Sequence, residues 1–311
     1  MSDAVTADAT ELGEPPPGVR GSAAWFGWLR GARGALPVIV VVAGLVALWE
    51  GYKVLGGLLD DRIGPWDLPV ATDDTTMPHS WAVIGSLGEE VQSGRTTEPL
   101  WRVLFDAALF TAREAGVGLV AGAAAGITIA VVFSLLPVLG RAFLPWVVVT
   151  QTIPFIATAP MVVIWGGRIG WDAWVSVSLI SFYLAFFPIV IAMDRGLASA
   201  DPSKLELMRS YGAGRLSVLF RLRFPSAVPF LFSGLRLSAA AAVIGAIVGE
   251  LPSGQRDGVG RLLLTFTSFF DLDPERLYAA VAASAMLGLA FVGAVAAAEK
   301  VVGRSMGTVS P

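Results

Sequence analysis

Long stretches with almost no charged side chains constrain this chain more than any other feature. Residues 174–193 carry no charge, and residues 229–248 carry only Arg236. A transmembrane helix needs about 20 mostly apolar residues to cross the hydrocarbon core of a bilayer. The chain as a whole is 55% hydrophobic and 15% charged, which excludes an ordinary soluble domain. We therefore predict an all-α integral membrane protein.

The apolar runs and their flanking charges predict about six transmembrane helices. Arg20, Arg30 and Arg33 precede the first run, so the positive-inside rule places the N-terminus in the cytoplasm. This first transmembrane helix covers residues 34–59. The other spans are expected near residues 105–136, 143–165, 172–193, 229–248 and 277–298. An even number of crossings returns the C-terminus to the cytoplasm.

The polar regions complete the expected organisation. Residues 1–33 are rich in Ala, Asp, Glu, Gly and Pro, a composition typical of a disordered cytoplasmic tail. Residues 60–104 are acidic and form an extracytoplasmic segment, in which residues 82–92 have a helical pattern. Residues 105–303 form the membrane core, and residues 304–311 form a second cytoplasmic tail.

The rarest residue types exclude several kinds of chemistry. The chain has no cysteine, which rules out disulfides, Cys-ligated zinc, iron–sulfur clusters and thiol catalysis. Its single histidine, His79, lacks neighbours that would complete a metal site, so we interpret it as a loop residue rather than a ligand or proton sensor. No cofactor or metal is expected to bind this chain.

Two spans contain small or polar residues at helical spacing. Gly118, Gly122 and Gly126 recur every four residues and predict a smooth face for close helix contact. Arg113 and Glu114 precede them and either lie near the outer interface, where they can snorkel, or face the translocation pathway, and we favour snorkelling. Arg236, two turns into the fifth span, is expected to form an ion pair or to anchor the helix.

The segment 201–225 is the one long basic stretch between two apolar runs. Its five cationic residues place it on the cytoplasmic side. Asp201 is a good N-cap followed by Pro202, and Gly212 permits a sharp turn. A second amphipathic helix is expected to end at Pro225. A helical loop with an apolar patch favours a docking element over an ordinary basic loop.

This segment resembles the EAA motif of ABC importer permeases. Glu206, Gly212 and Pro225 fall at the motif's spacing, whereas Leu207 and Met208 replace its two alanines. In that family the loop is a coupling helix that docks into a groove of a cytoplasmic ATPase. The resemblance implies coupling roles for Glu206, Leu207, Met208, Tyr211, Gly212 and Pro225.

The resemblance also implies a fold and a set of partners. The fold would be that of a type I ABC importer permease, in the cell inner membrane. The chain lacks a GxxxxGK[ST] nucleotide-binding motif, so ATP and magnesium would bind a separate ATPase dimer and this subunit would not be an enzyme. One coupling loop per chain implies a second permease subunit, either a homodimer or a heterodimer with a paralogue. An extracytoplasmic binding protein and membrane lipid complete the partners, and no nucleic acid is expected.

Polar residues within the spans are candidates for the translocation pathway. The third span contains Pro154 and Pro160, which kink a helix and leave carbonyl groups to be satisfied by neighbours. Near these prolines and in the next two spans lie the candidate residues Gln151, Thr152, Ser181, Tyr183 and Glu250. For Glu250, at the outer end of its span, we expect a structural or gating role.

Three stretches resemble the subfamily that imports nitrate, sulfonates, taurine, or pyrimidine and riboflavin-type vitamin precursors. They are LMRSYGAG, RFPSAVPFLFSGLR and VIGAIVGE. A tightly held anion would need a cation at mid-membrane, and only Arg236 lies at a plausible depth. This argues against nitrate or sulfonate being held tightly by the chain itself. The substrate expected is a small organic solute, and the resemblance, mainly in the last two stretches, favours a vitamin or pyrimidine precursor over sulfonate, taurine or nitrate.

Two other classes of function compete with an importer subunit. An ion-coupled secondary transporter or channel would need acidic residues in its spans or repeated halves, and the central spans are nearly uncharged. A membrane-embedded enzyme would need a cluster of catalytic side chains, which the sequence does not show. A structural membrane protein is the other member of this second class.

Overall fold

A computed structural model describes residues 32–59, 62–63, 66–93 and 96–305. The chain divides into two compact units, Met1–Thr72 and Asp73–Pro311. The expected tail at residues 1–33 falls almost entirely outside the described residues, as does most of the tail at 304–311. The first unit contains helix α1 (Ala32–Leu58) and the short antiparallel pair β1 (Arg62–Ile63) and β2 (Trp66–Asp67).

The second unit is mainly helical. Its elements are α2 (Ser80–Ser86), β3 (Glu90–Ser93), β4 (Thr96–Pro99), α3 (Leu100–Leu135), α4 (Pro137–Thr150), α5 (Phe155–Arg168), α6 (Ala173–Ala198), α7 (Pro202–Ser210), α8 (Arg215–Val218), the π-helix η2 (Leu219–Arg223), α9 (Phe224–Ser253), α10 (Val259–Ser268) and α11 (Pro274–Ser305). In the described part of the chain, five helical stretches are long and apolar enough to cross a membrane, or six if α4 and α5 count as one bent span. The predicted all-α membrane fold is confirmed.

Close backbone contact joins α3 to α6. A Cβ atom added to Gly118 would lie 2.5 Å from Cβ of Ser181, and one added to Gly126 would lie 2.9 Å from Ile189. Gly122 has a similar position against Ala185. The glycines are required because any side chain would push the helices apart, so the predicted contact face is confirmed.

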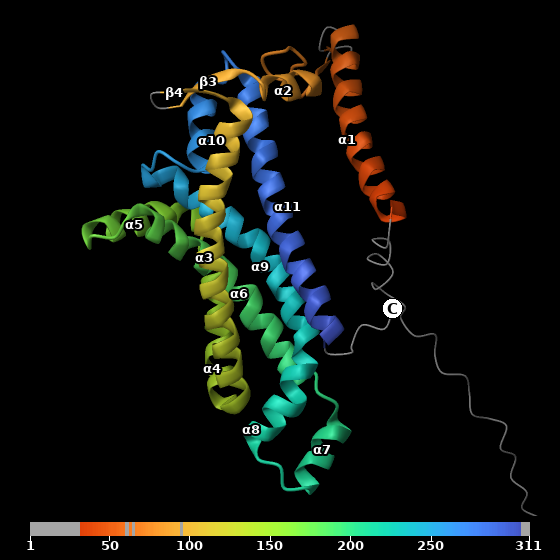
Figure 1. Cartoon of the computed structure of the whole chain (residues 1–311), viewed down its shortest axis with the longest axis vertical. Coiled ribbons are helices and arrows are strands. Elements are labelled where there is room, and N and C mark those ends of the chain that lie inside the picture. The colour runs from red at the N-terminus through yellow and green to blue at the C-terminus, as the bar shows by residue number, and fades with distance from the viewer. Residues whose placement is uncertain (1–31, 60–61, 64–65, 94–95, 306–311) are drawn as a thin grey trace, which may run out of the picture. The chain divides into compact units, whose positions relative to one another are not determined.

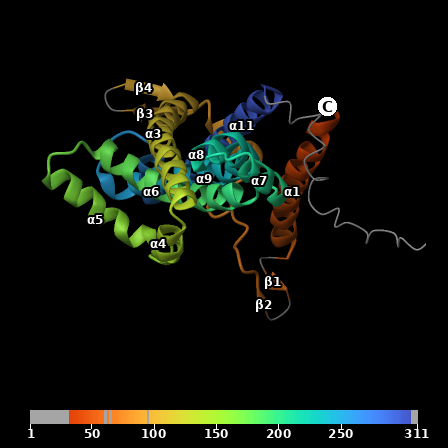
Figure 2. The same ribbon diagram turned by 90° about the horizontal axis from the view of Figure 1, so that it is seen from below.

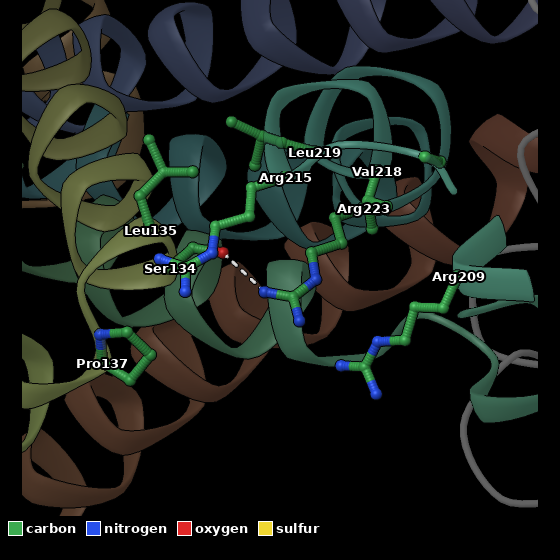
Figure 3. A pocket seen from close by; sticks show the side chains of 9 residues that line it. Ser134, Leu135, Pro137, Arg209, Arg215, Val218, Leu219 and Arg223 are labelled. Carbon is green, nitrogen blue, oxygen red and sulfur yellow. Dashed lines mark hydrogen bonds between the residues drawn. The ribbon is translucent and has the colours of Figure 1, made fainter. Parts of the chain in front are cut away.

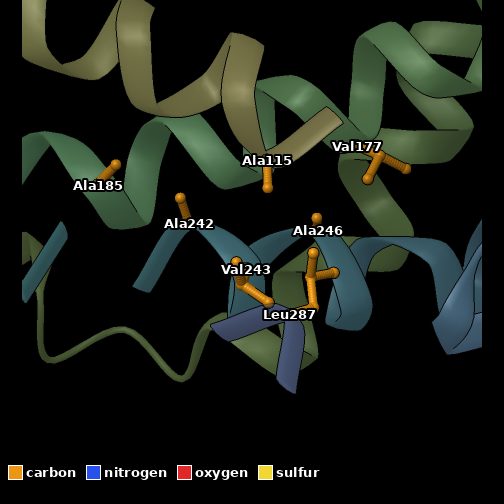
Figure 4. Packing of buried hydrophobic residues seen from close by; sticks show 7 residues of the cluster. All are labelled: Ala115, Val177, Ala185, Ala242, Val243, Ala246 and Leu287. Atoms are coloured by element: carbon orange, nitrogen blue, oxygen red, sulfur yellow. The ribbon is translucent and has the colours of Figure 1, made fainter. Parts of the chain in front are cut away.

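The centre of the second unit is built from small apolar side chains. Figure 4 shows a cluster to which α3, α6, α9 and α11 all contribute. Its members are Ala115, Val177, Ala185, Ala242, Val243, Ala246 and Leu287. Because lipid tails are as apolar as these side chains, the helices associate through dense packing rather than through escape from water.

The third expected span, residues 143–165, is broken rather than merely kinked. Helices α4 and α5 meet at an angle of 95°. Pro154 has no N–H to donate to the Thr150 carbonyl, so the helix cannot continue through this position. The Tyr183 hydroxyl of α6 instead donates to that carbonyl at 2.7 Å. Figure 2 shows α4 and α5 on one side of α3 and α6, away from α11.

The segment before α3 also differs from expectation. The helix expected at residues 82–92 ends at Ser86, and the chain continues as a hairpin in which β3 pairs with β4. Helix α3 follows the hairpin directly and begins at Leu100 rather than near residue 105. Leu100 and Leu104 are buried against Phe266 and Ala280, so packing extends the membrane core into the expected extracytoplasmic segment.

Candidate docking loop and buried polar residues

The segment 201–225 folds locally as predicted up to its turn. The Asp201 side chain accepts a hydrogen bond of 2.9 Å from the Ser203 backbone N–H, which caps α7. Gly212 has φ +70°, a left-handed conformation that favours glycine. The Ala213 N–H then donates to the Met208 carbonyl at 3.0 Å. The turn is thus fixed by backbone hydrogen bonds.

Helix α7 exposes large apolar side chains beside charged ones. Leu207 is 55% exposed and Tyr211 82% exposed, and the Glu206 side chain is exposed beside them. Met208 is half-buried. Figure 1 shows α7 and α8 at the end of the second unit opposite α2 and the β3–β4 hairpin. An ordered helix with exposed apolar residues at the tip of the bundle is suited to insertion into a groove of another protein.

Pro225 does not end a helix, contrary to expectation. It lies in the first turn of α9, which continues from α8 through the π-helix Leu219–Arg223. The Phe224 N–H donates to the Leu219 carbonyl, five residues earlier. The wider π-helical turn accommodates a residue that lacks an N–H and whose ring would clash in a regular helix. Pro225 is therefore separated from the α7 residues, which are brought together in one short helix and turn.

The expected pathway residues fall into two groups. Gln151 and Thr152 are exposed at the break between α4 and α5, and the Thr152 hydroxyl donates to the Val149 carbonyl at 2.8 Å. Tyr183 is half-buried against the same break and stacks on Phe155 with ring centroids 5.2 Å apart. These three residues surround one bend in the chain.

Ser181 belongs to the second, fully buried group. Its hydroxyl donates to the Ala242 carbonyl at 2.8 Å and so links α6 to α9. Nearby, the Ser238 hydroxyl donates to the Ala185 carbonyl at 2.6 Å in the opposite direction. The structure therefore places Ser181 in helix packing, where two serines bond across to the neighbouring helix rather than back to their own.

Glu250 lies at the centre of a buried polar cluster. Its carboxylate accepts hydrogen bonds from the Thr111 hydroxyl and the Gly260 N–H, each at 2.6 Å. The Val259 N–H donates to the Thr111 oxygen at 2.9 Å. The cluster thus fastens the end of α9 to α3 and to the first turn of α10. Its position supports the structural part of the role expected for Glu250.

Glu114 is a member of this cluster that sequence reasoning misplaced. The side chain is 0% exposed and accepts a hydrogen bond of 3.2 Å from the Gln255 amide, so the expectation of snorkelling is wrong for this residue. The signal was present, because Glu114 shares a helical face with Gly118 and Gly122. Arg113, one residue earlier, is exposed and lies over the Trp174 ring at 4.6 Å.

Two further expectations concern charged or titratable groups. Arg236 forms an ion pair with Glu299 that joins α9 to α11, which confirms the predicted pairing. His79 precedes α2, stacks on Trp81 at 4.0 Å and lies 3.9 Å from the Asp74 carboxylate. Within the described ranges, no group of His, Asp and Glu side chains is arranged to hold a metal ion.

The comparison with protein families identifies the core. Residues 118–300, more than half of the 311-residue chain, match the family described as binding-protein-dependent transport system inner membrane component. The chain belongs to this family. It is therefore a multi-pass inner membrane protein whose matched region extends from α3 through the segment 201–225 to α11.

Several relatives of this inner membrane component are transport permeases. The chain is 38% identical, over 42% of its length and 50% of the relative's, to the formylaminopyrimidine transport permease protein ThiX of Halalkalibacterium halodurans. It is 32% identical, over 49% and 54%, to the riboflavin transport system permease protein RibX of Chloroflexus aurantiacus. A probable ABC transporter permease protein of Haemophilus influenzae is 31% identical over 52% of this chain and 64% of its own length. These matches span about half to two thirds of each relative.

Proposed function

We propose that this chain is the permease subunit of an ATP-driven importer and that the segment 201–225 couples it to a separate ATPase. The observation that carries the proposal is α7, an ordered helix at one end of the helical bundle, where Leu207 of the helix and Tyr211 just after it are exposed. Membership in a binding-protein-dependent transport family supports it. In this arrangement Glu206, Leu207, Met208, Tyr211 and Gly212 form the docking surface, and Pro225 shapes the helix behind it.

The proposed partners follow from the same family. A cytoplasmic ATPase dimer binds ATP and magnesium, and an extracytoplasmic binding protein delivers the substrate. Two copies of this chain form a homodimer, because each carries one docking segment and each ATPase needs one. Both termini lie in the cytoplasm, on the same side as α7.

The proposed substrate is a small organic solute, with a vitamin or pyrimidine precursor favoured. ThiX and RibX are named for formylaminopyrimidine and riboflavin transport. More distant relatives are named for aliphatic sulfonates and nitrate. Arg236 is held by Glu299, which leaves it less suited to binding an anion and favours the first class.

The mechanism is a change of conformation rather than bond chemistry in this chain. Binding of ATP draws the two ATPase subunits together and displaces α7 with them. Close packing at Gly118, Gly122 and Gly126 keeps α3 and α6 together, so the displacement moves helices as bodies. Opening alternates between the two sides of the membrane, driven by the different affinities of ATP for the two states.

A tagged full-length chain tests the coupling role. It is extracted in mild detergent from its native host, and the proteins that copurify are identified. Tyr211→Glu places a charge on the exposed docking surface, and Leu272→Glu makes a comparable change at a 77% exposed residue between α10 and α11. Figure 1 shows α10 near the end of the second unit opposite α7. We expect a stoichiometric ATPase with the wild type and Leu272→Glu, and its loss with Tyr211→Glu.

Two results would overturn the proposal. One is purification of the wild-type chain alone across several detergents, followed by ion-driven uptake in vesicles without ATP. The other is equal ATPase recovery with the Tyr211→Glu and Leu272→Glu variants, which would show that α7 is not the docking helix.

A further inference from the structure

A cavity of about 360 Å³ lies between the end of α3 and the segment 201–225. Figure 3 shows it from close by. The lining residues come from α3, α4, α7, α8 and η2, and most of the polar ones are cationic. They are Ser134, Leu135, Pro137, Arg209, Ala213, Arg215, Val218, Leu219 and Arg223.

Three arginines direct their side chains toward this cavity. Figure 3 shows the guanidinium groups of Arg209, Arg215 and Arg223 pointing into a common space from two sides. No acidic side chain lines the cavity, and none of the three arginines forms an ion pair with another described residue. Arg209 and Arg215 are exposed and Arg223 is half-buried. Like charges around one cavity repel one another, so an anion between them would stabilise the arrangement.

Arg223 gives a second, independent indication of a missing partner. Its Nη1 donates to the Ser134 hydroxyl oxygen at 2.9 Å, which fixes the direction of the side chain. Its Nε is buried and has no hydrogen-bond acceptor within the described part of the chain. A buried donor on a charged group is costly unless it is satisfied. Arg223 therefore has a donor without an acceptor in the described part of the chain, beside a cavity that no acidic side chain lines.

We propose that this cavity binds a phosphate group. Arginine presents several N–H donors in a planar fork that matches phosphate oxygens, and three such groups could surround one phosphate. The cavity has room for more than the phosphate alone, because a water molecule takes only about 30 Å³ in the liquid. The cavity therefore has room for a further chemical group attached to the phosphate.

The surroundings favour a phospholipid headgroup over a free phosphate compound. Leu136 and Val138 lie next to the cavity-lining residues and are 50% and 70% exposed, as expected of side chains in contact with acyl chains. Basic pockets between membrane helices on the cytoplasmic side bind anionic headgroups. The choice of a lipid rests on the cytoplasmic placement of α7 proposed above, whereas the phosphate chemistry does not.

Two double variants separate the effect of the cavity arginines from the effect of the overall positive charge at the α7 end of the second unit. Arg209→Gln with Arg215→Gln removes two cavity arginines. Arg195→Gln with Arg221→Gln removes the same charge from two exposed residues that do not line the cavity. Native mass spectrometry of the full chain in detergent measures binding of phosphatidylglycerol and, separately, of phosphatidylcholine. A parallel titration with inorganic phosphate follows the thermal unfolding midpoint.

We expect phosphatidylglycerol to bind the wild type more tightly than phosphatidylcholine, and the cavity variant to lose about tenfold or more in affinity, given roughly one tenfold factor for every one to two arginines near an anionic surface. The Arg195→Gln/Arg221→Gln control should keep its affinity. A phosphate-dependent rise in the midpoint without selective lipid binding would assign the site to a free phosphate compound. Equal losses in both double variants, or no binding of either probe, would overturn the proposal. If the ATPase still copurified while the lipid test failed, the phosphate proposal alone would be overturned and the proposed transport function would stand.

Discussion

At the scale of single residues, the space available to a side chain determines what each glycine of α3 contributes. Gly118 faces Ser181 so closely that an added Cβ would overlap it, whereas Gly116 has no atom within 4 Å of the same position. The two residues lie half a turn apart on one helix. They therefore offer a direct comparison between a packing glycine and a tolerant one.

Gly118→Ala should destabilise the chain by about 1–3 kcal/mol, because the new methyl group must push α3 away from α6. Gly116→Ala, its control, should be neutral or stabilising by up to about 1 kcal/mol through better helix propensity. Unfolding in detergent, followed by circular dichroism, measures both. Equal stability of the two variants would contradict the close approach of the helices.

The carboxylate of Glu250 is the other residue-scale determinant. Glu250→Ala should cost about 1–3 kcal/mol, because the buried Gly260 N–H loses its acceptor and the Thr111 hydroxyl is left with only the Ala107 carbonyl. Glu250→Gln should cost much less, since its amide oxygen can accept from Gly260 while its N–H donates to the Thr111 oxygen. Unfolding midpoints of the pair test this order, and a glutamine variant as unstable as the alanine variant would refute it.

At the scale of elements, the break between α4 and α5 depends on a side chain from another helix. Pro154 frees the Thr150 carbonyl, and the Tyr183 hydroxyl of α6 satisfies it. Sequence reasoning found the prolines and the need for a partner, because both follow from local backbone chemistry. It did not find the partner or the 95° angle, because these depend on where α6 lies.

Tyr183→Phe should destabilise the chain by about 1 kcal/mol, the net value of one hydrogen bond, while keeping the ring stacked on Phe155. Tyr211→Phe makes the same change at a residue whose side chain is 82% exposed and should have no measurable effect on stability. Protease cleavage near residues 150–155 reports on loosening of the break. Unchanged cleavage in Tyr183→Phe would show that the hydroxyl does not hold it.

Other elements show the same division between local and distant causes. The cap at Asp201 and the turn at Gly212 were predictable, since each needs only one residue type and its neighbours. The β3–β4 hairpin and the pairing of Thr111 with Glu250 were not, because the sequence gives no direct signal for which distant groups meet. Glu114 lies between these two cases. Its burial could be inferred from the glycines on the same face of α3, whereas its partner Gln255 could not.

At the scale of the whole molecule, topology is the property that the sequence predicts most directly. Charge asymmetry and span number predict that α7 lies in the cytoplasm, and α10, at the other end of the second unit, is then expected on the opposite side of the membrane. The absence of cysteine makes this simple to test, since any introduced thiol is the only one present.

Ser203→Cys in α7 and Ser268→Cys in α10, both exposed, should react differently with a membrane-impermeant maleimide. Intact spheroplasts should label Ser268→Cys, and inverted vesicles should label Ser203→Cys, with a preference of roughly tenfold or more because an intact bilayer excludes charged reagents. The cysteine-free chain is the control in both preparations. Labelling of Ser203→Cys in intact spheroplasts would reverse the topology.

The unbroken path from α8 through η2 into α9 has a mechanical consequence. The 39 residues Arg215–Ser253 form a rod of about 60 Å at the helical rise of 1.5 Å per residue. One end adjoins α7, and the hydrogen bonds of Glu250 hold the other end to α3 and α10. The widened turn at Leu219–Arg223 is the joint at which such a rod bends most readily. A displacement of α7 would therefore be transmitted along this long helix, which bends near its α7 end at Leu219–Arg223 and is held at its far end by Glu250.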